Sequence, residues 1–454
     1  MLSRKQAVDT VQDLINVHDA ERGKLDHVRR YWKGRQDLPA VVPQSAPQEV
    51  RKMAQIARVN VCDIVVDSLT QSLFVEGFRP GSELPRDRND NFETWNAWQA
   101  NRFDRGQVGV HRAGVAYGTA YTSVMPGDRF PVIRGHSPRQ MTALYGWDRD
   151  WPVLALERWG DGFRLYDEEA RWTFTRRLDP MGTPELTYVT VEEHRMGVCP
   201  VVRYLDAEDL DADDEPPRVS NIQGTEDGVV LGQVAPLIKL QDQIDMTTFG
   251  LLVAQHYSAF RQRWAIGWVA ESETQLMKAA ASQLWTFDEH PDEMKLGEFE
   301  QTNLDGYIKS REAALKYAAT ISQTPVHELI GELVNLSADA LAAAEAGRDR
   351  KVEERKNGFG ESHEQTMQLV GTLMGVEVPD DAQVVWRDTS ARSFAAVVDG
   401  LGKLVQMLGI PPQELWERVP GATQQDIARW KAAAEQGNAM AFLEDMAQRQ
   451  LEAA

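Results

Sequence analysis

The stretch 337–374 constrains the fold more than any other part of the sequence. It opens with six alanines between Ala338 and Ala346, a residue with high helix propensity, and continues with opposite charges at helical spacing, such as Arg350 and Glu354. A helix of about 38 residues would be about 57 Å long if unbroken. Gly358 and Gly360 are expected to kink it. A chain with so long a helix must either lay it across a large body or extend it beyond one.

The alanines give this helix a small face that another element can approach closely. Composition favours an ordinary buried helix pair within one domain. In front of the helix, the span 323–336 is expected to be an apolar loop that Pro325 and Gly331 interrupt. The loop has no evident place in a core.

The remaining pattern predicts an α+β fold that is mainly α. Short β-branched and aromatic runs between Gly, Pro and Asp predict an antiparallel sheet over 121–205. Apolar residues every three or four positions predict long helices over 237–260 and 304–322. A helix that begins near Asn89 is expected to run into a strand near Ala120, and "VVWRDTS" is a candidate strand near the C-terminal end.

Charge and cysteine content exclude several classes of protein. The formal net charge is −20, so tight DNA binding by phosphate neutralisation is not expected. Much of the negative charge lies in the segments 206–227 and 286–305. The first of these is expected to be a solvated loop, as blocks of like charge usually are. The 2 cysteines cannot build a disulfide framework, which indicates a reducing compartment. We expect no signal peptide and no membrane span.

Motifs for catalysis or metal binding are incomplete. "GVHRAGV" lacks the Lys and Ser/Thr of a phosphate loop, and "GHSPR" lacks the second glycine of a nucleophile elbow. His363 and Glu364 lack the second histidine of a zinc helix. "DLDADD" lacks the glycine and glutamate of a calcium loop, although a loosely bound divalent ion stays open. The 9 histidines are scattered along the chain and are expected to be ordinary surface or core residues. We expect no catalytic residues, no cofactor and no metal.

Three long segments resemble the portal proteins of tailed bacteriophages, of the siphophage type found in phages of Gram-positive hosts. They are "PLIKLQDQIDMTTFGLLVAQHYSAFRQRWAIGW", "GEFEQTNLDGYIKSREAALKYAATISQTPVHELIG" and "LVNLSADALAAAEAGRDRKVEERKNGFGE". Weaker matches bring the resemblance to nearly the whole chain. It implies a portal fold assembled as a cyclic ring, usually of twelve subunits, at one capsid vertex, through which double-stranded DNA is packaged and ejected.

The resemblance also implies a division of the chain into regions. These are a wing (1–227), a stem helix (228–262), a clip (263–300), a second stem helix (301–322), a tunnel loop (323–336), the long helix with its return to the wing (337–390), and crown helices (391–454).

Two sets of residues would then face partners. The tunnel loop facing DNA would comprise Gln323, Thr324, His327, Glu328, Gly331, Glu332 and Asn335. The clip would offer a docking surface of Trp264, Trp268, Trp285 and Phe287, although the residues alone favour the core of the small module as the place of the tryptophans. The implied partners are other copies of the chain, DNA, the terminase large subunit, a head–tail adaptor and the major capsid protein. The implied location is the virion, after assembly in the host cytoplasm.

Two other functions compete with this one. A phage head-maturation or packaging enzyme, such as a nuclease, would need carboxylates clustered around a metal, and the acids here are expected in loops. A helical scaffold with no role in DNA handling would need no open axis. The mass of the assembled particle would separate these alternatives.

Overall fold

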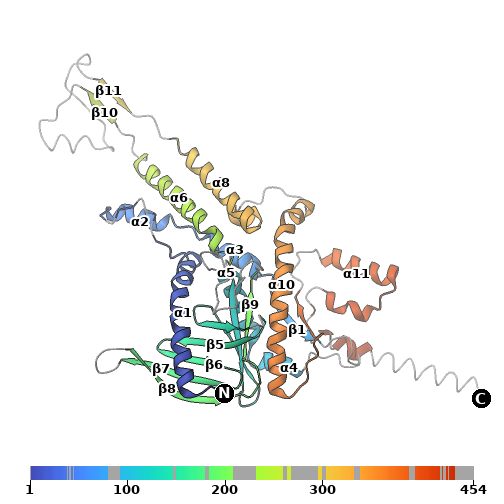
Figure 1. The fold of residues 1–454 in the computed structure, drawn as a ribbon. Helices are drawn as coiled ribbons and strands as arrows, with labels where there is room; N and C mark the ends of the chain where they lie inside the picture. The colour runs from blue at the N-terminus through green and yellow to red at the C-terminus, as the bar shows by residue number, and fades with distance from the viewer. Residues whose placement is uncertain are drawn as a thin grey trace, which may run out of the picture.

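The computed structural model describes residues 2–37, 39, 42–43, 45–79, 93–146, 150–178, 184–207, 232–258, 263–266, 295–298, 303–331, 338–387, 394–419, 422, 426–427 and 429–434. Helices and antiparallel sheets combine in them, which confirms the α+β class. The sheets form a body with α10 along one side, and the pair α6 and α8 projects away from it (Figure 1).

The described residues up to 117 form five helices. The first, α1, begins with a capping box in which Ser3 and Gln6 satisfy each other's free backbone N–H groups. Its apolar face, which includes Val11 and Ile15, covers the largest sheet. The expected single helix before Ala120 is wrong: α4 ends at Ala100, and Arg102 takes a left-handed conformation (φ 52°) before α5 begins. The bounds are α1 Arg4–Trp32, α2 Gln48–Ile56, α3 Val61–Thr70, α4 Glu93–Ala100 and α5 Phe103–Tyr117.

The predicted antiparallel strands are present, but they form two sheets. One has the order β3-β2-β9 and the other runs consecutively from β4 to β8. Strand β2 is buried along its whole length because it lies in the centre of its sheet with α5 packed near it. The bounds are β2 Thr119–Met125, β3 Val132–His136, β4 Met141–Tyr145, β5 Pro152–Trp159, β6 Gly162–Tyr166, β7 Ala170–Leu178, β8 Pro184–Glu193 and β9 Val201–Leu205.

A small third sheet joins distant parts of the chain. Strand β1 (Val75–Arg79) pairs antiparallel with β12 (Gln383–Trp386), which confirms the candidate strand near the C-terminal end. Helix α10 (Ala338–Met374) runs beside them and continues through Gly358 and Gly360 as one helix. A Cβ atom at position 360 would lie 3.6 Å from Trp386 and Val384, which is ordinary van der Waals contact, so β12 packs directly on this part of the helix.

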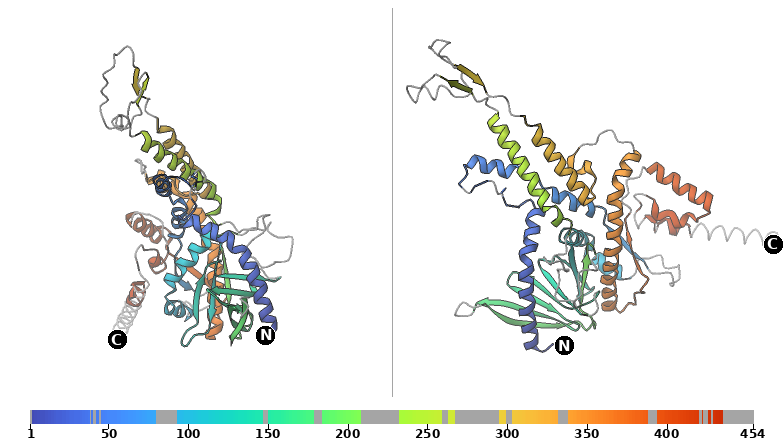
Figure 2. Two further views of the ribbon diagram at one scale, coloured as in Figure 1. Left: turned by 90° about the vertical axis from the view of Figure 1, so that its left-hand side faces the viewer. Right: turned by 45° about the horizontal axis from the view of Figure 1, so that its top comes forward.

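The projecting pair follows the two sheets in the chain. Both predicted long helices are confirmed, and two further views show them side by side with β10 and β11 at their far end (Figure 2). Helix α11 lies beyond α10, away from the largest sheet (Figure 1). The bounds are η2 Ala235–Leu237, α6 Ile238–Ser258, β10 Arg263–Ile266, β11 Lys295–Glu298, α8 Asp305–Ser322, α9 Val326–Ile330, α11 Phe394–Leu408 and η3 Pro412–Arg418.

The main core lies where α3, α5, β2 and α10 meet. Trp98, Phe78 and Phe359 are among its largest fully buried side chains. Residue 114 has to be glycine for this packing, because a Cβ atom there would lie 2.8 Å from the ring of Phe359. The long helix is thus part of the body along its C-terminal portion.

Candidate functional site

The pair α6 and α8 packs through small residues. Ala314, Ala318 and Ala319 of α8 are buried, and Gly250 of α6 leaves room for the ring of Tyr307, since a Cβ atom there would lie 3.0 Å from it. Tyr317 and Ile321 on another side of α8 remain 61% and 52% exposed. This uncovered apolar side is unusual for a finished protein surface and is available for contact outside the chain.

A network of hydrogen bonds holds the N-terminal part of α6 against the body. The buried Asp245 accepts hydrogen bonds from the Gln36 side chain at 2.7 Å and the Val59 backbone N–H at 3.1 Å. Gln241 donates to Asp245 at 2.8 Å and accepts from the Val61 N–H at 3.0 Å. Burial raises the pKa of Asp245, and these hydrogen bonds oppose that rise. The direction in which the helix leaves the body is therefore set by specific contacts.

The chain turns sharply after α8. Gln323 has a left-handed backbone (φ 56°), Pro325 precedes α9, and Gly331 ends α9 with a second left-handed residue (φ 77°). The expected loop is therefore wrong over 326–330, which is a short helix. Its Val326 is 41% exposed, whereas Leu329 and Ile330 pack partly against the main core.

Two charged side chains of α10 contact this turn. Arg348 pairs with Glu328 of α9 at 2.7 Å, and Lys351 donates to the backbone carbonyl of Ser322, the last residue of α8, at 2.9 Å. Lys351 also donates to Gln233. Burial, followed by the neighbouring Arg355, lowers the pKa of Lys351 to about 8. The span 323–336 contains no Lys or Arg, so the positive charge beside it comes from the next helix, α10.

The proposed tunnel-loop residues fall into four groups. Gln323 and Gly331 are exposed and His327 is half-buried, as a contact surface would need. The prediction that Thr324 faces outward is wrong. Its side chain is buried and accepts a hydrogen bond from Ser322 Oγ at 2.9 Å. Glu328 is half-buried in its ion pair. Glu332 and Asn335 lie outside the described residues.

The proposed clip residues lie almost wholly outside the described part of the chain. Trp264 belongs to β10, where only the backbone is described, and β10 pairs antiparallel with β11. The other three residues, Trp268, Trp285 and Phe287, are not described. Their docking role stays a prediction.

A buried imidazole network was missed in the sequence, where the histidines looked scattered. His111 Nε2 of α5 lies 2.8 Å from His363 Nε2 of α10, and His363 Nδ1 lies 3.0 Å from the Tyr204 hydroxyl. Tyr204 and Thr122 each contact the Thr366 hydroxyl, at 2.9 Å and 2.8 Å. Burial lowers the pKa of His111 to about 4 and that of His363 well below its usual range. Both imidazoles are neutral near pH 7 and join α10 to α5, β2 and β9.

A buried ion pair lies about two turns of α10 before His363. Arg355 Nε and Nη2 lie 2.9 Å and 3.1 Å from the two carboxylate oxygens of Asp206, which follows β9. Gln233 donates to the same carboxylate at 2.5 Å. Since Gln233 also contacts Lys351, a continuous polar chain runs from the end of β9 to the end of α8.

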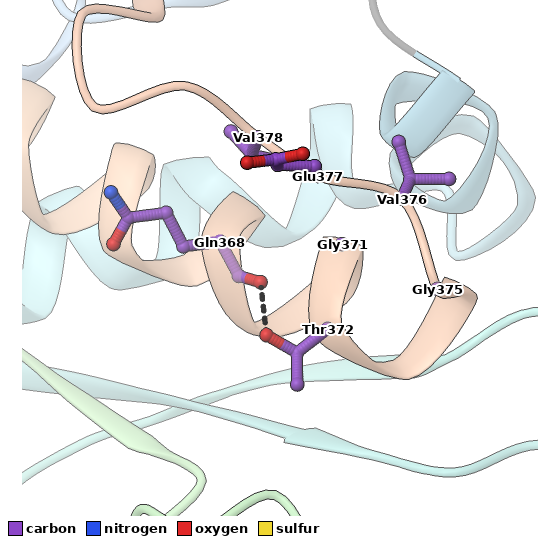
Figure 3. Close-up of a pocket in the computed structure, with 7 residues that line it drawn as sticks. All are labelled: Gln368, Gly371, Thr372, Gly375, Val376, Glu377 and Val378. Atoms are coloured by element: carbon purple, nitrogen blue, oxygen red, sulfur yellow. Dashed lines mark hydrogen bonds between the residues drawn. The ribbon is translucent and has the colours of Figure 1, made fainter.

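A pocket of 430 Å³ lies at the C-terminal end of α10, where the chain turns back (Figure 3). Thr372 Oγ1 donates to the Gln368 carbonyl at 3.0 Å, and Glu377 supplies the pocket's one carboxylate. This lining offers no acid–base pair or nucleophile. The lining residues are Gln368, Gly371, Thr372, Gly375, Val376, Glu377 and Val378.

The structure shows where one of the incomplete sequence motifs lies, and another falls outside the described residues. "GVHRAGV" lies within α5, so it is not a loop that could surround a phosphate. The acidic run "DLDADD" lies outside the described residues. Within the described ranges, no three His, Cys, Asp or Glu side chains gather as they would around a metal ion. A search of the same ranges finds no helix that has both the length and the apolar character to cross a membrane.

Comparison with known proteins gives a match over most of the chain. The model of the family described as "Phage portal protein, SPP1 Gp6-like" matches residues 11–439. A portal protein of Mycobacterium phage L5 is 26% identical over 415 residues, which cover 83% of this chain and 78% of the relative. A portal protein of Mycobacterium phage D29 is 25% identical over 457 residues, which cover 92% of this chain and 87% of the relative.

Solved structures give a more distant likeness. The chain is 12% identical, with a TM-score of 0.48, to a chain in the neck of an empty gene transfer agent particle, covering 82% of this chain and 92% of that one. A chain in the virion of a native gene transfer agent particle has the same identity and TM-score, with coverage of 84% and 97%.

Proposed function

The chain belongs to the phage portal protein family of the SPP1 Gp6-like type, and from this premise we propose that its copies form a closed ring around a central channel for double-stranded DNA. The family match from residue 11 to residue 439 is the observation that carries the proposal. The ring would sit at one vertex of the capsid, in the virion, with about twelve subunits in the head-to-tail arrangement of cyclic assemblies.

The projecting pair α6 and α8 fits the part of such a ring that lines the channel. Tyr317 and Ile321 of α8 are exposed in the single chain, and a neighbouring copy would cover them in a ring. The helices are joined to the body at one end only, so identical pairs can stand side by side around an axis. Heterologous contact of this kind buries one surface of each copy against a different surface of the next.

The charge of the chain suits passage of DNA better than binding. A net charge of −20 repels phosphates, and a channel that held each phosphate tightly would impede movement. At α9 the Arg348 guanidinium is already paired with Glu328, and Glu345 lies 3.6 Å from it. We therefore assign α9 a steric role beside the DNA and expect weak affinity of the ring for free duplex.

We assign the remaining regions from the resemblance to portal proteins. The body up to residue 227 would be the wing, 228–262 and 301–322 the stem, 263–300 the clip, 323–336 the tunnel loop, and 337–390 the long helix with its return to the wing. The C-terminal helices from 391 would form the crown. The clip would meet the terminase motor during packaging and the head–tail adaptor afterwards, and the outer face would contact the major capsid protein. We propose no catalytic activity for the chain itself.

Particle mass and shape test the ring directly. Native mass spectrometry is expected to give a species of about twelve times the 51.1 kDa chain mass, with eleven to thirteen copies also consistent, and electron microscopy an open axis. Monomer and dimer alone, at micromolar concentration and across several salt concentrations, would overturn the proposal.

Removal of α9 tests the channel. Deleting Val326–Ile330 is expected to leave ring formation intact and to reduce the DNA retained per particle in a packaging assay, because the deletion removes a steric element and not an assembly surface. Normal DNA content in particles with the deletion would contradict the assignment of α9 to the channel. A nuclease would instead cut duplex DNA in the presence of divalent ions, and loss of that activity on mutating one acidic residue of this chain would establish the enzyme alternative.

A further inference from the structure

Helix α9 is only partly packed against the rest of the chain. None of its five residues is buried, although Leu329 and Ile330 pack partly against the main core. Left-handed residues, Gln323 and Gly331, lie on either side of the helix, so the backbone turns sharply at both ends. A segment with so little buried surface depends on side-chain contacts for its position.

The first such contact is the ion pair between Arg348 and Glu328. The two side chains are only 18% and 23% exposed, and their closest atoms are 2.7 Å apart. Arg348 also lies 3.4 Å from Asp349 and 3.6 Å from Glu345, so three carboxylates surround one guanidinium. Among the described residues, this ion pair is the salt bridge that joins α9 to α10.

The second contact acts on the end of α8. The last carbonyl groups of a helix have no partner within it, and they form the negative end of the helix dipole. Lys351 Nζ donates to the Ser322 carbonyl at 2.9 Å and so satisfies one of them with a cation. Through Gln233, the same ammonium group is connected to Asp206 beside β9. The end of α8 is thereby tied to the body and not only to α10.

We propose that Arg348 and Lys351 are positioning residues that form a two-point latch for the turn between α8 and α9. Lys351 fixes the point at which the chain leaves α8, and Arg348 fixes the orientation of α9 about its left-handed ends. Breaking the Arg348–Glu328 pair lets α9 move as a unit while α8 and α10 stay in place. The importance of the latch for DNA rests on the proposed function, whereas the latch itself does not.

Hydrogen exchange of the full-length chain, followed by mass spectrometry, tests the latch. Arg348→Ala and Glu328→Gln are each expected to speed exchange of the α9 amides by about fivefold, the effect of a partly exposed ion pair. The double variant is expected to match the singles, because both changes break the same contact. Lys351→Met is expected to speed exchange at the end of α8 as well. Two charged positions on the same helix, changed in Arg350→Ala and Lys356→Met, serve as controls that should leave α9 unchanged.

The outcomes separate the latch from the ring. Wild-type exchange at α9 in both single variants, or effects that add in the double variant, would overturn the latch even if rings form normally. Failure of the wild-type chain to form rings would overturn the proposed function and leave the exchange comparison valid. If both hold, Arg348→Ala rings are expected to form normally and to differ from wild type in the DNA they retain.

Discussion

The two halves of α10 are held in opposite ways. From Arg355 to Val370 the helix presents buried side chains to α5, β2 and β9, and its polar groups contact partners that are buried too. From Ala343 to Arg350 it presents exposed or half-buried positions, and its contact with α9 is an ion pair. Ala343, Ala344 and Ala346 are exposed, so at these positions the small face is not part of a buried helix pair within the chain.

This difference separates a fixed part of the molecule from an adjustable one. Neutral hydrogen bonds among buried rings are costly to break, because each lost partner leaves a desolvated polar group. A partly exposed ion pair is screened by salt and contributes little to stability. The C-terminal half therefore sets where the helix lies, and the N-terminal half can change its contacts at small cost.

The largest effect is expected from breaking the buried ion pair. Arg355→Met should lower the free energy of unfolding by about 3–5 kcal/mol, because it leaves the Asp206 carboxylate buried without its cation. Denaturant unfolding at a fixed chain concentration measures this. Adding Asp206→Leu should recover part of the loss, since the unpaired charge is then absent. The exposed Arg350→Ala, on the other half of the helix, should change stability by less than about 0.5 kcal/mol. Equal effects at 350 and 355 would remove the distinction between the halves.

The histidine network should give the next largest effect, as a dependence on pH. Folding holds His111 and His363 neutral, whereas unfolded histidines titrate near pH 6.5, so the unfolded state binds more protons below that pH. Their contribution to stability is complete above pH 6.5 and is lost as pH falls toward about 4. The slope should approach about 1.4 kcal/mol per pH unit for each histidine. Unfolding of wild type and His363→Gln should be compared from pH 7 to pH 4.5.

His27, which is exposed, supplies the control for the pH dependence. His27→Gln should keep the wild-type slope, whereas His363→Gln should flatten it at a lower overall stability. An unchanged slope in His363→Gln would mean that other groups, such as the buried His136, cause the acid sensitivity.

The smallest effects come from a matched pair of glycines in helices. Gly114→Ala should destabilise by about 1–3 kcal/mol, because the new methyl group would lie 2.8 Å from the Phe359 ring on the fixed half of α10. Gly347→Ala meets nothing closer than 3.9 Å and should stabilise by about 0.5–1 kcal/mol through helix propensity. Thermal unfolding of the two variants gives the comparison. Destabilisation at position 347 would indicate that the N-terminal half is packed more tightly than its contacts suggest.

The sequence predicted the elements better than the contacts between them. Helical spacing found α6, α8 and α10, and β-branched runs found the strands, because these signals are local. The break between α4 and α5 depends on the backbone of Arg102, which has no strong local signal. The short helix α9 was predicted as a loop because Pro325 and Gly331 lie at its two ends, and the five residues between them are too few to show a helical pattern.

The site was harder to predict because its partners are far apart in the sequence. His111 and His363 are separated by 252 positions, and nothing near either residue indicates a partner. Glu328 was predicted to belong to a tunnel loop facing DNA, and its cationic partner on α10, 20 positions later, was not predicted. Family resemblance indicated the family of the chain, and it could not supply these individual contacts.

The pairing of β1 with β12 also means that the small sheet can form only after most of the chain has been synthesised. Arg387 and Glu76, which pair beside these strands, are 311 positions apart in the sequence, and α6 and α8 are synthesised between them. At the usual pace of bacterial synthesis, roughly 15 to 60 seconds pass between the two strands leaving the ribosome. During that interval the hydrophobic surface that α10 and β12 later cover is open to solvent. The newborn chain is therefore most vulnerable to aggregation just before its last third arrives.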